Sequence, residues 1–383
     1  MWFFSAPKKI IFGEEALEGL NEIEGKKALI VSDKNIQQLG IIKPVISILN
    51  QKSIKYVVFT DIDPEPSIPS AEQGAEIALK ENVDIIIALG GGSVIDVAKA
   101  IWIFYENPKM NIDEVFPEDP LTLRKKANLI TIPTTSGTGS DANWAIVIAD
   151  PETRQKLSVA HRNIIPDLDI VDPLFSKKLP PHLIASTGFD ALTHAIEAAS
   201  VEWKNDFSTA FSHRVIEIVF KYLPRSVKNS SDKEAKEKMH IAATMAGIAF
   251  GNSQIGGAHA LGHALGASFS LPHSEIIAVV LPHMMRFCIK DKTTEKIYED
   301  IVYHAKIASN EKTVNGIILI EKIEELMKEL NLKTKLSDFG ITKKQLEEHM
   351  DKIISFTLSD TGALVNPCEL DEEIIATLCK NML

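Results

Sequence analysis

The sequence predicts two domains, a Rossmann-like α/β domain with a parallel sheet followed by an all-helical domain. Short apolar, β-branched runs alternate with helical patterns in the first half, which is typical of βαβ units. From about Leu179 onward, helical periodicity dominates and strand-like runs are scarce. A chain of 383 residues is also too long for one small core. We therefore expect domains at 1–180 and 181–383.

The elements of each domain follow from local patterns. Four apolar, β-branched runs of the first domain are expected to be buried strands, at 27–32, 56–60, 83–89 and 128–133. Helices are expected at 70–81 and 93–105. Pro180-Pro181 then interrupts the chain. Amphipathic patterns in the second domain predict helices at 204–223, 233–250, 292–309, 317–329 and 343–354.

Composition argues against several classes of partner. The net charge is -11 and no run is rich in Lys or Arg, so neither nucleic acid nor an anionic membrane surface is expected as a partner. No apolar run approaches the roughly 20 residues of a membrane span, and the N-terminal charges follow the apolar stretch, the reverse of a secretory signal. Cys288, Cys368 and Cys379 show no paired spacing, which predicts reduced thiols in a cytoplasmic protein.

Two glycine-containing loops follow predicted strands. Gly90-Gly91-Gly92-Ser93 comes directly after the third strand and opens a helix, where free N–H groups suit a pyrophosphate. The spacing is not the common G-x-G-x-x-G, and a glycine triplet is equally consistent with a tight turn. The second loop, residues 133–141, carries hydroxyls and glycines at the end of the fourth strand. Together the loops predict a nucleotide site at the carboxyl ends of the strands.

Asp33 ends the first predicted strand. A carboxylate there can accept hydrogen bonds from ribose hydroxyls and repel a 2′-phosphate, which favours NAD over NADP. The alternative is that Asp33 caps the helix that follows. Both interpretations stand at this point.

A carboxylate and several imidazoles recur at helical spacing in the second domain. Asp190 and His194 are four residues apart, as are His259 and His263, and His273 follows Leu271-Pro272 in a predicted turn. Asp190, His194, His259 and His273 could bind one borderline divalent metal ion. A single pair of this kind is more often a surface or capping pair. The His-x-x-x-His spacing also occurs in zinc peptidases, but those require Glu after the first histidine, and here Ala260 stands there.

At this point the sequence resembles the iron-containing (group III) alcohol dehydrogenase family. The resemblance is carried by GGGSVIDVAKA, IPTTSGTGSDA, LPPHLIASTGFDALTHAIEA and GGAHALGHALGASFSLPH, in the family's order and spacing. It implies a nucleotide-binding α/β domain, a helical metal domain and an active cleft between them.

The resemblance also implies roles for individual residues. Asp190, His194, His259 and His273 match the family's four metal ligands, and His263 matches a histidine near the nicotinamide. Phe250 matches an aromatic residue of the substrate channel, and Trp144 beside the second loop suggests that this channel is apolar. The positions that match cofactor contacts are Gly91, Gly92, Ser93, Asp96, Thr134, Thr135, Thr138 and Lys156.

The implied activity is reversible hydride transfer between a primary alcohol, or its aldehyde, and NAD(P). A metal ion would lower the pKa of the alcohol, and His263 would relay the proton; its alternative role is that of a packed helix histidine. General affinity favours Zn²⁺, but the complete ligand set resembles the Fe²⁺ members. Alternatives are a zinc-using glycerol or polyol dehydrogenase, a dehydroquinate-synthase-like lyase, a metal-dependent hydrolase or a non-enzymatic nucleotide sensor.

Some positions depart from the family pattern. The tail reads Asp360-Thr-Gly-Ala-Leu-Val-Asn-Pro-Cys368, without the Arg that follows Asn-Pro in some members. Such departures leave the alcohol unidentified. The apolar stretch 2–12 predicts an edge strand that could pair with a second copy, so a homodimer or higher homo-oligomer is expected.

Overall fold

The computed structural model describes residues 3–63, 66–150, 155–177, 179–307 and 315–383. The chain forms two compact units, one comprising Ser5–Lys178 and the other Leu179–Leu383 with the first residues of the chain. The sequence analysis placed the division after residue 180 and assigned the whole N-terminus to the first domain. Phe4 instead belongs to the helical unit, because its ring packs 4.9 Å from that of Phe207.

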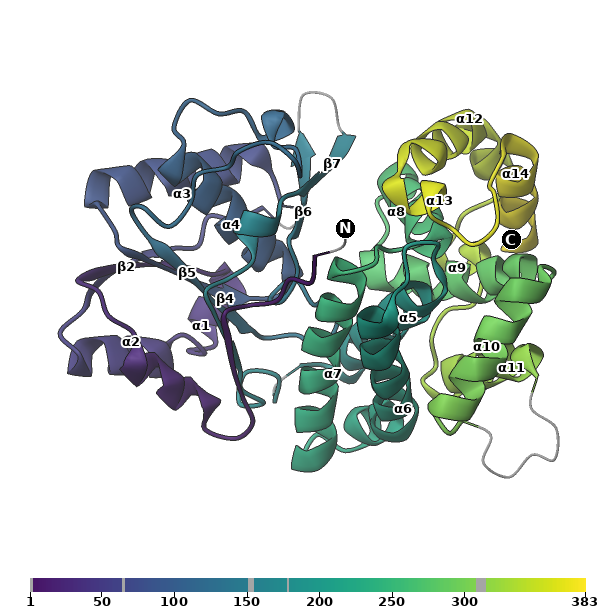
Figure 1. Ribbon diagram of the computed structural model, residues 1–383, viewed down its shortest axis with the longest axis horizontal. Helices are drawn as coiled ribbons and strands as arrows, with labels where there is room; N and C mark the ends of the chain where they lie inside the picture. The colour runs from purple at the N-terminus through teal and green to yellow at the C-terminus, as the bar shows by residue number, and fades with distance from the viewer. Residues whose placement is uncertain (1–2, 64–65, 151–154, 178, 308–314) are drawn as a thin grey trace. The chain divides into compact units, whose positions relative to one another are not determined.

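The α/β unit is built on a six-stranded parallel sheet (Figure 1). In spatial order its strands are β1 (Lys9–Phe12), β8 (Leu168–Val171), β5 (Asn128–Pro133), β4 (Ile85–Gly90), β2 (Lys27–Val31) and β3 (Lys55–Phe59). Strands β2, β3, β4 and β5 correspond to the four strands expected from the sequence. The analysis did not assign β8 or the antiparallel pair β6 (Ala145–Asp150) and β7 (Gln155–Ala160).

Both faces of this sheet are covered by helices, which explains its continuous apolar runs. Along β4, Ile86 and Ala88 pack in one core with α3 (Ile68–Glu81) and α4 (Gly92–Glu106). Ile85, Ile87 and Leu89 alternate with them and pack in a second core with α2 (Lys43–Gln51). The short helix α1 (Lys34–Gln38) follows β2. The sheet is therefore rigid where β4 and β5 end.

The second unit is helical throughout its described residues. Its helices are α5 (Pro181–Ser200), α6 (Asp206–Lys228), α7 (Lys233–Gly251), α8 (Gly257–Phe269), α9 (His273–Cys288), α10 (Lys292–His304), α11 (Gly316–Glu329), α12 (Lys343–Ser359), α13 (Thr361–Leu364) and α14 (Glu372–Asn381). Polar side chains cap the N-terminal ends of several of these helices, for example Asn205 before α6 and Asp291 before α10. These two units confirm the predicted fold class.

Helix α5 is the most deeply buried of these helices and packs against α6, α7 and α9. Helix α8 packs against α9, α12 and α13. No helix among the described residues combines the length and apolar character that crossing a membrane would require. The helices that carry the predicted metal ligands thus lie in the interior of their unit.

Candidate functional site

Three of the predicted ligands meet inside the helical unit. Asp190 lies on α5, His259 on α8, and His273 is the first residue of α9. Asp190 Oδ1 is 3.5 Å from His259 Nε2 and 3.6 Å from His273 Nε2. These separations exceed a good hydrogen bond but match the distance of about 3.4 Å between two ligand atoms of a tetrahedral site with bonds of about 2.1 Å. Among the described residues, these three form a group with metal-site spacing.

His194 lies beside this group without joining the same set of mutually close ligand atoms. Its Nδ1 is 3.9 Å from Asp190 Oδ2, as expected for residues one helical turn apart. Its ring is stacked between His259, at 4.3 Å between centroids, and Phe250, at 4.4 Å. His194 therefore adjoins the site, and Phe250 holds its ring from the other side.

The ligand atoms themselves have no hydrogen-bond partner. Both carboxylate oxygens of Asp190, Nδ1 of His194 and Nε2 of His259 are buried and unpaired. An unpaired buried polar atom costs about 1–3 kcal/mol, so several together at one point require an explanation. A cation bound among them would satisfy these atoms at once, and the residues therefore fit a metal ion.

Glu197 is a member of the site that the sequence analysis did not single out. It lies one turn after His194 on α5, and its carboxylate accepts a hydrogen bond from His259 Nδ1 at 2.5 Å. It also accepts the backbone N–H groups of Ala258 at 2.7 Å and His259 at 3.3 Å. A carboxylate on one ring nitrogen leaves the other free to bind a metal. The sequence could have indicated this role, because Glu197 stands seven residues after Asp190 and so lies on the same face of the helix.

The pKa values of these groups reflect how closely they are packed. Burial disfavours a charge on His259, but the carboxylates of Glu197 and Asp190 outweigh it and raise the pKa of His259 to about 10. Burial alone would raise the pKa of Asp190, yet the neighbouring imidazoles hold that pKa well below its usual range. Asp190 is therefore ionised, as a metal ligand must be.

His263 lies next to the cluster but has a different partner. Its Nδ1 is 2.9 Å from Asp360 Oδ2, and its ring stacks on that of His273 with 5.2 Å between centroids. Asp360 also caps α13 by accepting the N–H of Gly362 at 2.8 Å. The sequence analysis did not foresee this pairing, because Asp360 lies 97 residues further along the chain.

The two glycine-containing loops meet at the carboxyl ends of β4 and β5. Gly91 caps α4, which begins at Gly92, and Thr134 N–H donates to Gly90 O at 3.0 Å. A Cβ on Gly92 would lie 2.8 Å from the Thr138 side chain, and one on Gly91 would lie 3.3 Å from Thr135. Only glycine thus allows the loops to approach this closely. Ser93 is exposed at the start of α4.

Asp96 contributes to this region by holding it together. One carboxylate oxygen accepts the hydroxyl of Ser140, and the other accepts the N–H of Val147 at 2.9 Å. The sequence analysis counted Asp96 among the cofactor contacts, which stays a prediction. Within the protein, the two bonds join α4 to the second loop and to β6.

The remaining predicted positions are distributed as follows. Asp33 caps α1, because its Oδ1 accepts the N–H of Ile36 at 2.9 Å. Trp144 is half-buried in the α/β unit, where the Arg162 guanidinium lies 5.2 Å from its ring centroid. Phe250 belongs to the other unit. Lys156 lies in β7, and its side chain is outside the described residues.

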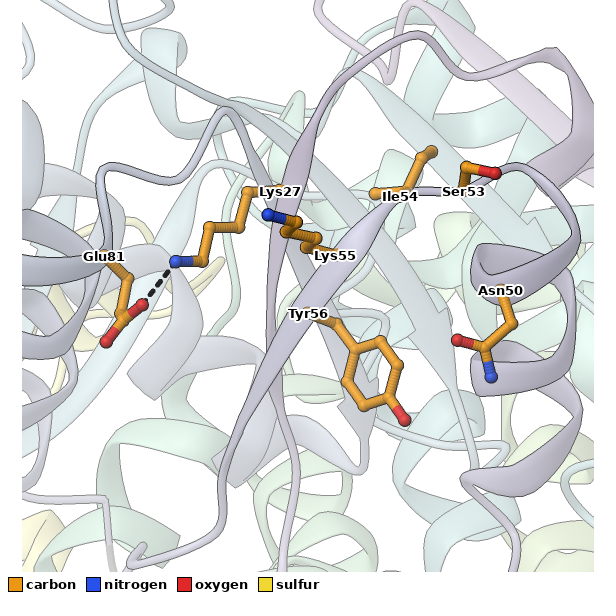
Figure 2. A pocket seen from close by; sticks show the side chains of 7 residues that line it. All are labelled: Lys27, Asn50, Ser53, Ile54, Lys55, Tyr56 and Glu81. Atoms are coloured by element: carbon orange, nitrogen blue, oxygen red, sulfur yellow. Dashed lines mark hydrogen bonds and ion pairs between the residues drawn. The ribbon is translucent and has the colours of Figure 1, made fainter.

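A surface pocket of about 490 Å³ lies elsewhere on the α/β unit (Figure 2). Lys27 and Lys55, which line the pocket, are the first residues of β2 and β3. The pocket therefore lies at the amino ends of these strands. Figure 2 shows Lys27 paired with Glu81 across one side of it. Nucleotides bind at the opposite, carboxyl edge of such sheets, so this pocket is not the predicted site.

Comparison with known proteins identifies the family. A family model described as iron-containing alcohol dehydrogenase matches residues 7–173. The C-terminal model of the Fe-containing alcohol dehydrogenase family matches residues 184–383. The chain belongs to the iron-containing alcohol dehydrogenase family. This membership confirms the family resemblance seen in the sequence.

Relatives of this iron-containing alcohol dehydrogenase extend over nearly its full length. The NADPH-dependent butanol dehydrogenase of Clostridium saccharobutylicum is 36% identical, with 97% of this chain and 96% of that protein covered. Aldehyde-alcohol dehydrogenase 2 of Entamoeba histolytica is 38% identical over 74% of this chain, which spans only 34% of that longer protein.

Solved structures agree with this assignment. The iron-containing alcohol dehydrogenase of Thermococcus thioreducens superposes with a TM-score of 0.90 at 30% identity, covering 99% of each chain. A 1,3-propanediol oxidoreductase superposes with a TM-score of 0.91 at 28% identity, covering 100% of each chain. The protein is accordingly an NAD(P)-dependent alcohol dehydrogenase that acts on small molecules.

Proposed function

We propose that the chain interconverts a primary alcohol and its aldehyde with NAD(P), using Fe²⁺ held by Asp190, His194, His259 and His273. The cluster of buried ligand atoms without hydrogen-bond partners carries this proposal. One carboxylate and three imidazoles suit a borderline divalent ion, and no thiolate is present to select a softer one. When bound, the metal would polarise the alcohol oxygen and so favour loss of its proton.

The protein's own residues prepare the site for this chemistry. Glu197 takes the Nδ1–H of His259, which leaves the Nε2 lone pair directed at the ligand cluster. Phe250 holds the ring of His194 by stacking. Asp190 supplies a negative charge that stabilises a cation in a buried environment. These contacts preorganise the ligands before substrate binds.

His263 is the proposed proton relay. Asp360 accepts its Nδ1–H, so Nε2 is the nitrogen that can take up the proton from the alcohol. The same contact places the Asp360 carboxylate against the ring and fixes its orientation. Asp360 therefore orients the relay without itself contacting substrate.

Replacing Asp360 with asparagine should lower kcat by roughly 10–100-fold, less than most of the 10²–10⁴-fold range attributed to acid–base catalysis, because the His263 imidazole itself is retained. Asparagine still offers an oxygen to cap α13 but removes the negative charge beside the His263 ring. The measurement is steady-state kinetics across pH, together with metal content. Unchanged kcat at full metal content would refute the relay, whereas equal losses of kcat and metal would make Asp360 merely structural.

The glycine loops are proposed to bind the cofactor. Gly91, Gly92 and Ser93 would offer backbone N–H groups and a hydroxyl to the pyrophosphate. Thr134, Thr135, Thr138 and Lys156 are further proposed contacts. Asp33 is proposed to favour NAD, although the butanol dehydrogenase relative is NADPH-dependent by name.

Replacing Asp33 with glycine should raise the preference for NADP over NAD by about tenfold, equivalent to about 1.4 kcal/mol of relieved repulsion. Asp33→Asn is the matched control, because it keeps an oxygen for the Ile36 N–H while removing the charge. The measurement is kcat/KM with each cofactor. If both variants keep the original ratio, Asp33 serves only as a helix cap.

The overall proposal can be tested by an anaerobic assay after loading with Fe²⁺ or Zn²⁺. Oxidation of NADH and NADPH would be followed with linear aldehydes, ketones and diol-derived aldehydes. Phe250, and the proposed apolar contribution of Trp144, favour a small linear aldehyde as the best substrate. Preferential turnover of a polyol-derived ketone with zinc would instead identify a polyol dehydrogenase.

We further propose a cytoplasmic homodimer or higher homo-oligomer. Strand β1 is at the edge of the sheet, and Phe12 at its end is 63% exposed. An unpaired edge of this kind favours addition of another strand. The three cysteines are free thiols, which suits a reducing compartment. Light scattering of the purified protein would give its mass in solution.

A further inference from the structure

Two cysteines that the proposed reaction does not use meet in the helical unit. Cys288 is the last residue of α9, and Cys368 lies between α13 and α14. The Cys368 thiol donates a hydrogen bond to the carbonyl oxygen of Cys288 at 3.5 Å, so its side chain lies against the Cys288 residue. The two residues are 80 positions apart in the sequence. Cys368 is also the residue that stands where some family members carry arginine after Asn-Pro.

The two thiols differ in ways that suit a stepwise oxidation. Interaction with the neighbouring Cys288 side chain lowers the pKa of Cys368 to about 7, and Thr294 adds to this effect, although burial and Asp291 oppose it. The same interaction, with burial, raises the pKa of Cys288. Cys368 is half-buried, whereas Cys288 is 1% exposed. Cys368 is therefore the accessible member of the pair and the one that forms a thiolate, whereas Cys288 is the buried member.

The third cysteine provides a natural comparison within the same chain. Cys379 is buried on α14, and burial raises its pKa to about 12. Such a thiol is not expected to react first with an oxidant, and no other cysteine contributes to its pKa as Cys368 does to that of Cys288.

We propose that Cys288 and Cys368 form a redox-sensitive pair that hydrogen peroxide converts into an intrachain disulfide. The thiolate of Cys368 attacks one peroxide oxygen, the O–O bond breaks, and the departing hydroxide takes up a proton to give water. The sulfur of Cys288 then attacks the resulting sulfenic acid. The S–O bond breaks as the S–S bond forms, and the hydroxyl leaves with the Cys288 proton as a second water. Two thiols are thus oxidised while one peroxide is reduced to two waters.

Asn366 connects this pair to the helix that carries His259 and His263. Its Nδ2 donates to Cys288 Sγ at 3.5 Å and to Cys368 O at 2.7 Å, while its Oδ1 accepts the N–H of Gly257 at 3.0 Å. Gly257 is the first residue of α8. Closing an S–S bond of about 2.05 Å would move Cys288 Sγ toward Cys368 and so disturb the hydrogen bond that Asn366 donates to it. Oxidation should therefore loosen the first turn of α8.

The test is peroxide treatment of the full-length protein after chelation, so that bound iron does not itself catalyse oxidation. We expect titratable thiols under denaturing conditions to fall from three to one, and a reductant to restore all three. Non-reducing peptide mapping should find Cys288 joined to Cys368. Retention of all three thiols, or a disulfide that includes Cys379, would overturn the proposal.

Three variants separate the roles of the cysteines. With Cys288→Ser, which keeps a hydrogen-bonding group beside Cys368, oxidation should stop at a sulfenic acid that dimedone captures; with Cys368→Ser, no peroxide-dependent loss of thiol is expected. Cys379→Ser should still form the disulfide. Hydrogen exchange of peptides covering 257–263 should increase on oxidation, whereas peptides of α2 (Lys43–Gln51) should not change. Equal exchange in the oxidised and reduced protein would contradict the link through Asn366.

Discussion

Replacing His259 with alanine should abolish metal binding and turnover together. His259 Nε2 lies 3.5 Å from Asp190, compared with 3.6 Å for His273 and 3.9 Å for His194. This nitrogen is buried and has no hydrogen-bond partner. Alanine would remove a ligand and leave Asp190 as a buried charge with less compensation. The loss should appear as absent metal after loading and as turnover below detection.

A thermal measurement distinguishes loss of the site from loss of the fold. A metal ion at 100 times its dissociation constant stabilises a protein by about 2.7 kcal/mol, so zinc should raise the Tm of the wild-type protein and a chelator should reverse this. His259→Ala should show no such response. His304→Ala is the control, because His304 is exposed at the end of α10. Full activity in a metal-free His259→Ala protein would refute the assignment of the site.

Replacing Glu197 with alanine should weaken metal binding by about 10–100-fold, the range typical for residues that orient a metal-binding histidine. The variant would lose the acceptor for His259 Nδ1–H and for the N–H of Ala258. The His259 backbone N–H would lose its acceptor as well. Three buried donors would then be unsatisfied, at about 1–3 kcal/mol each, so the metal-free protein should also be less stable. Competition with a coloured chelator measures the first effect and denaturant unfolding the second.

Glu197→Gln separates orientation from charge. Glutamine keeps an oxygen that can accept the N–H of Ala258, so most of the stability should return, while metal affinity should recover only in part. Glu299→Gln on the exposed surface of α10 is the matched control and should leave both quantities unchanged. If Glu197→Ala bound metal as tightly as wild type, the carboxylate would have no role in orienting His259.

The sequence alone predicted much of the architecture. Continuous apolar, β-branched runs predicted strands β2 to β5, and helical periodicity predicted many of the helices, because such patterns indicate which sides of an element are buried. Strand β8 and the hairpin of β6 and β7 were not assigned. Phe4 groups with the helical unit, where its ring lies near those of Phe207 and Phe211, and no local pattern indicates such contacts between distant segments.

Within the candidate site, sequence spacing determined how residues of the same helix lie relative to one another. The spacing of Asp190 and His194, and of His259 and His263, follows from the pitch of a helix and needs no tertiary information. Only the tertiary structure decided which carboxylate is hydrogen-bonded to each histidine. Glu197 and His259 are 62 residues apart in the sequence, and His263 and Asp360 are 97 apart. The same is true of Asp96 in the loops and of the Cys288–Cys368 pair. The pattern of a sequence fixes the face on which a side chain lies, but the packing of distant elements selects its partner.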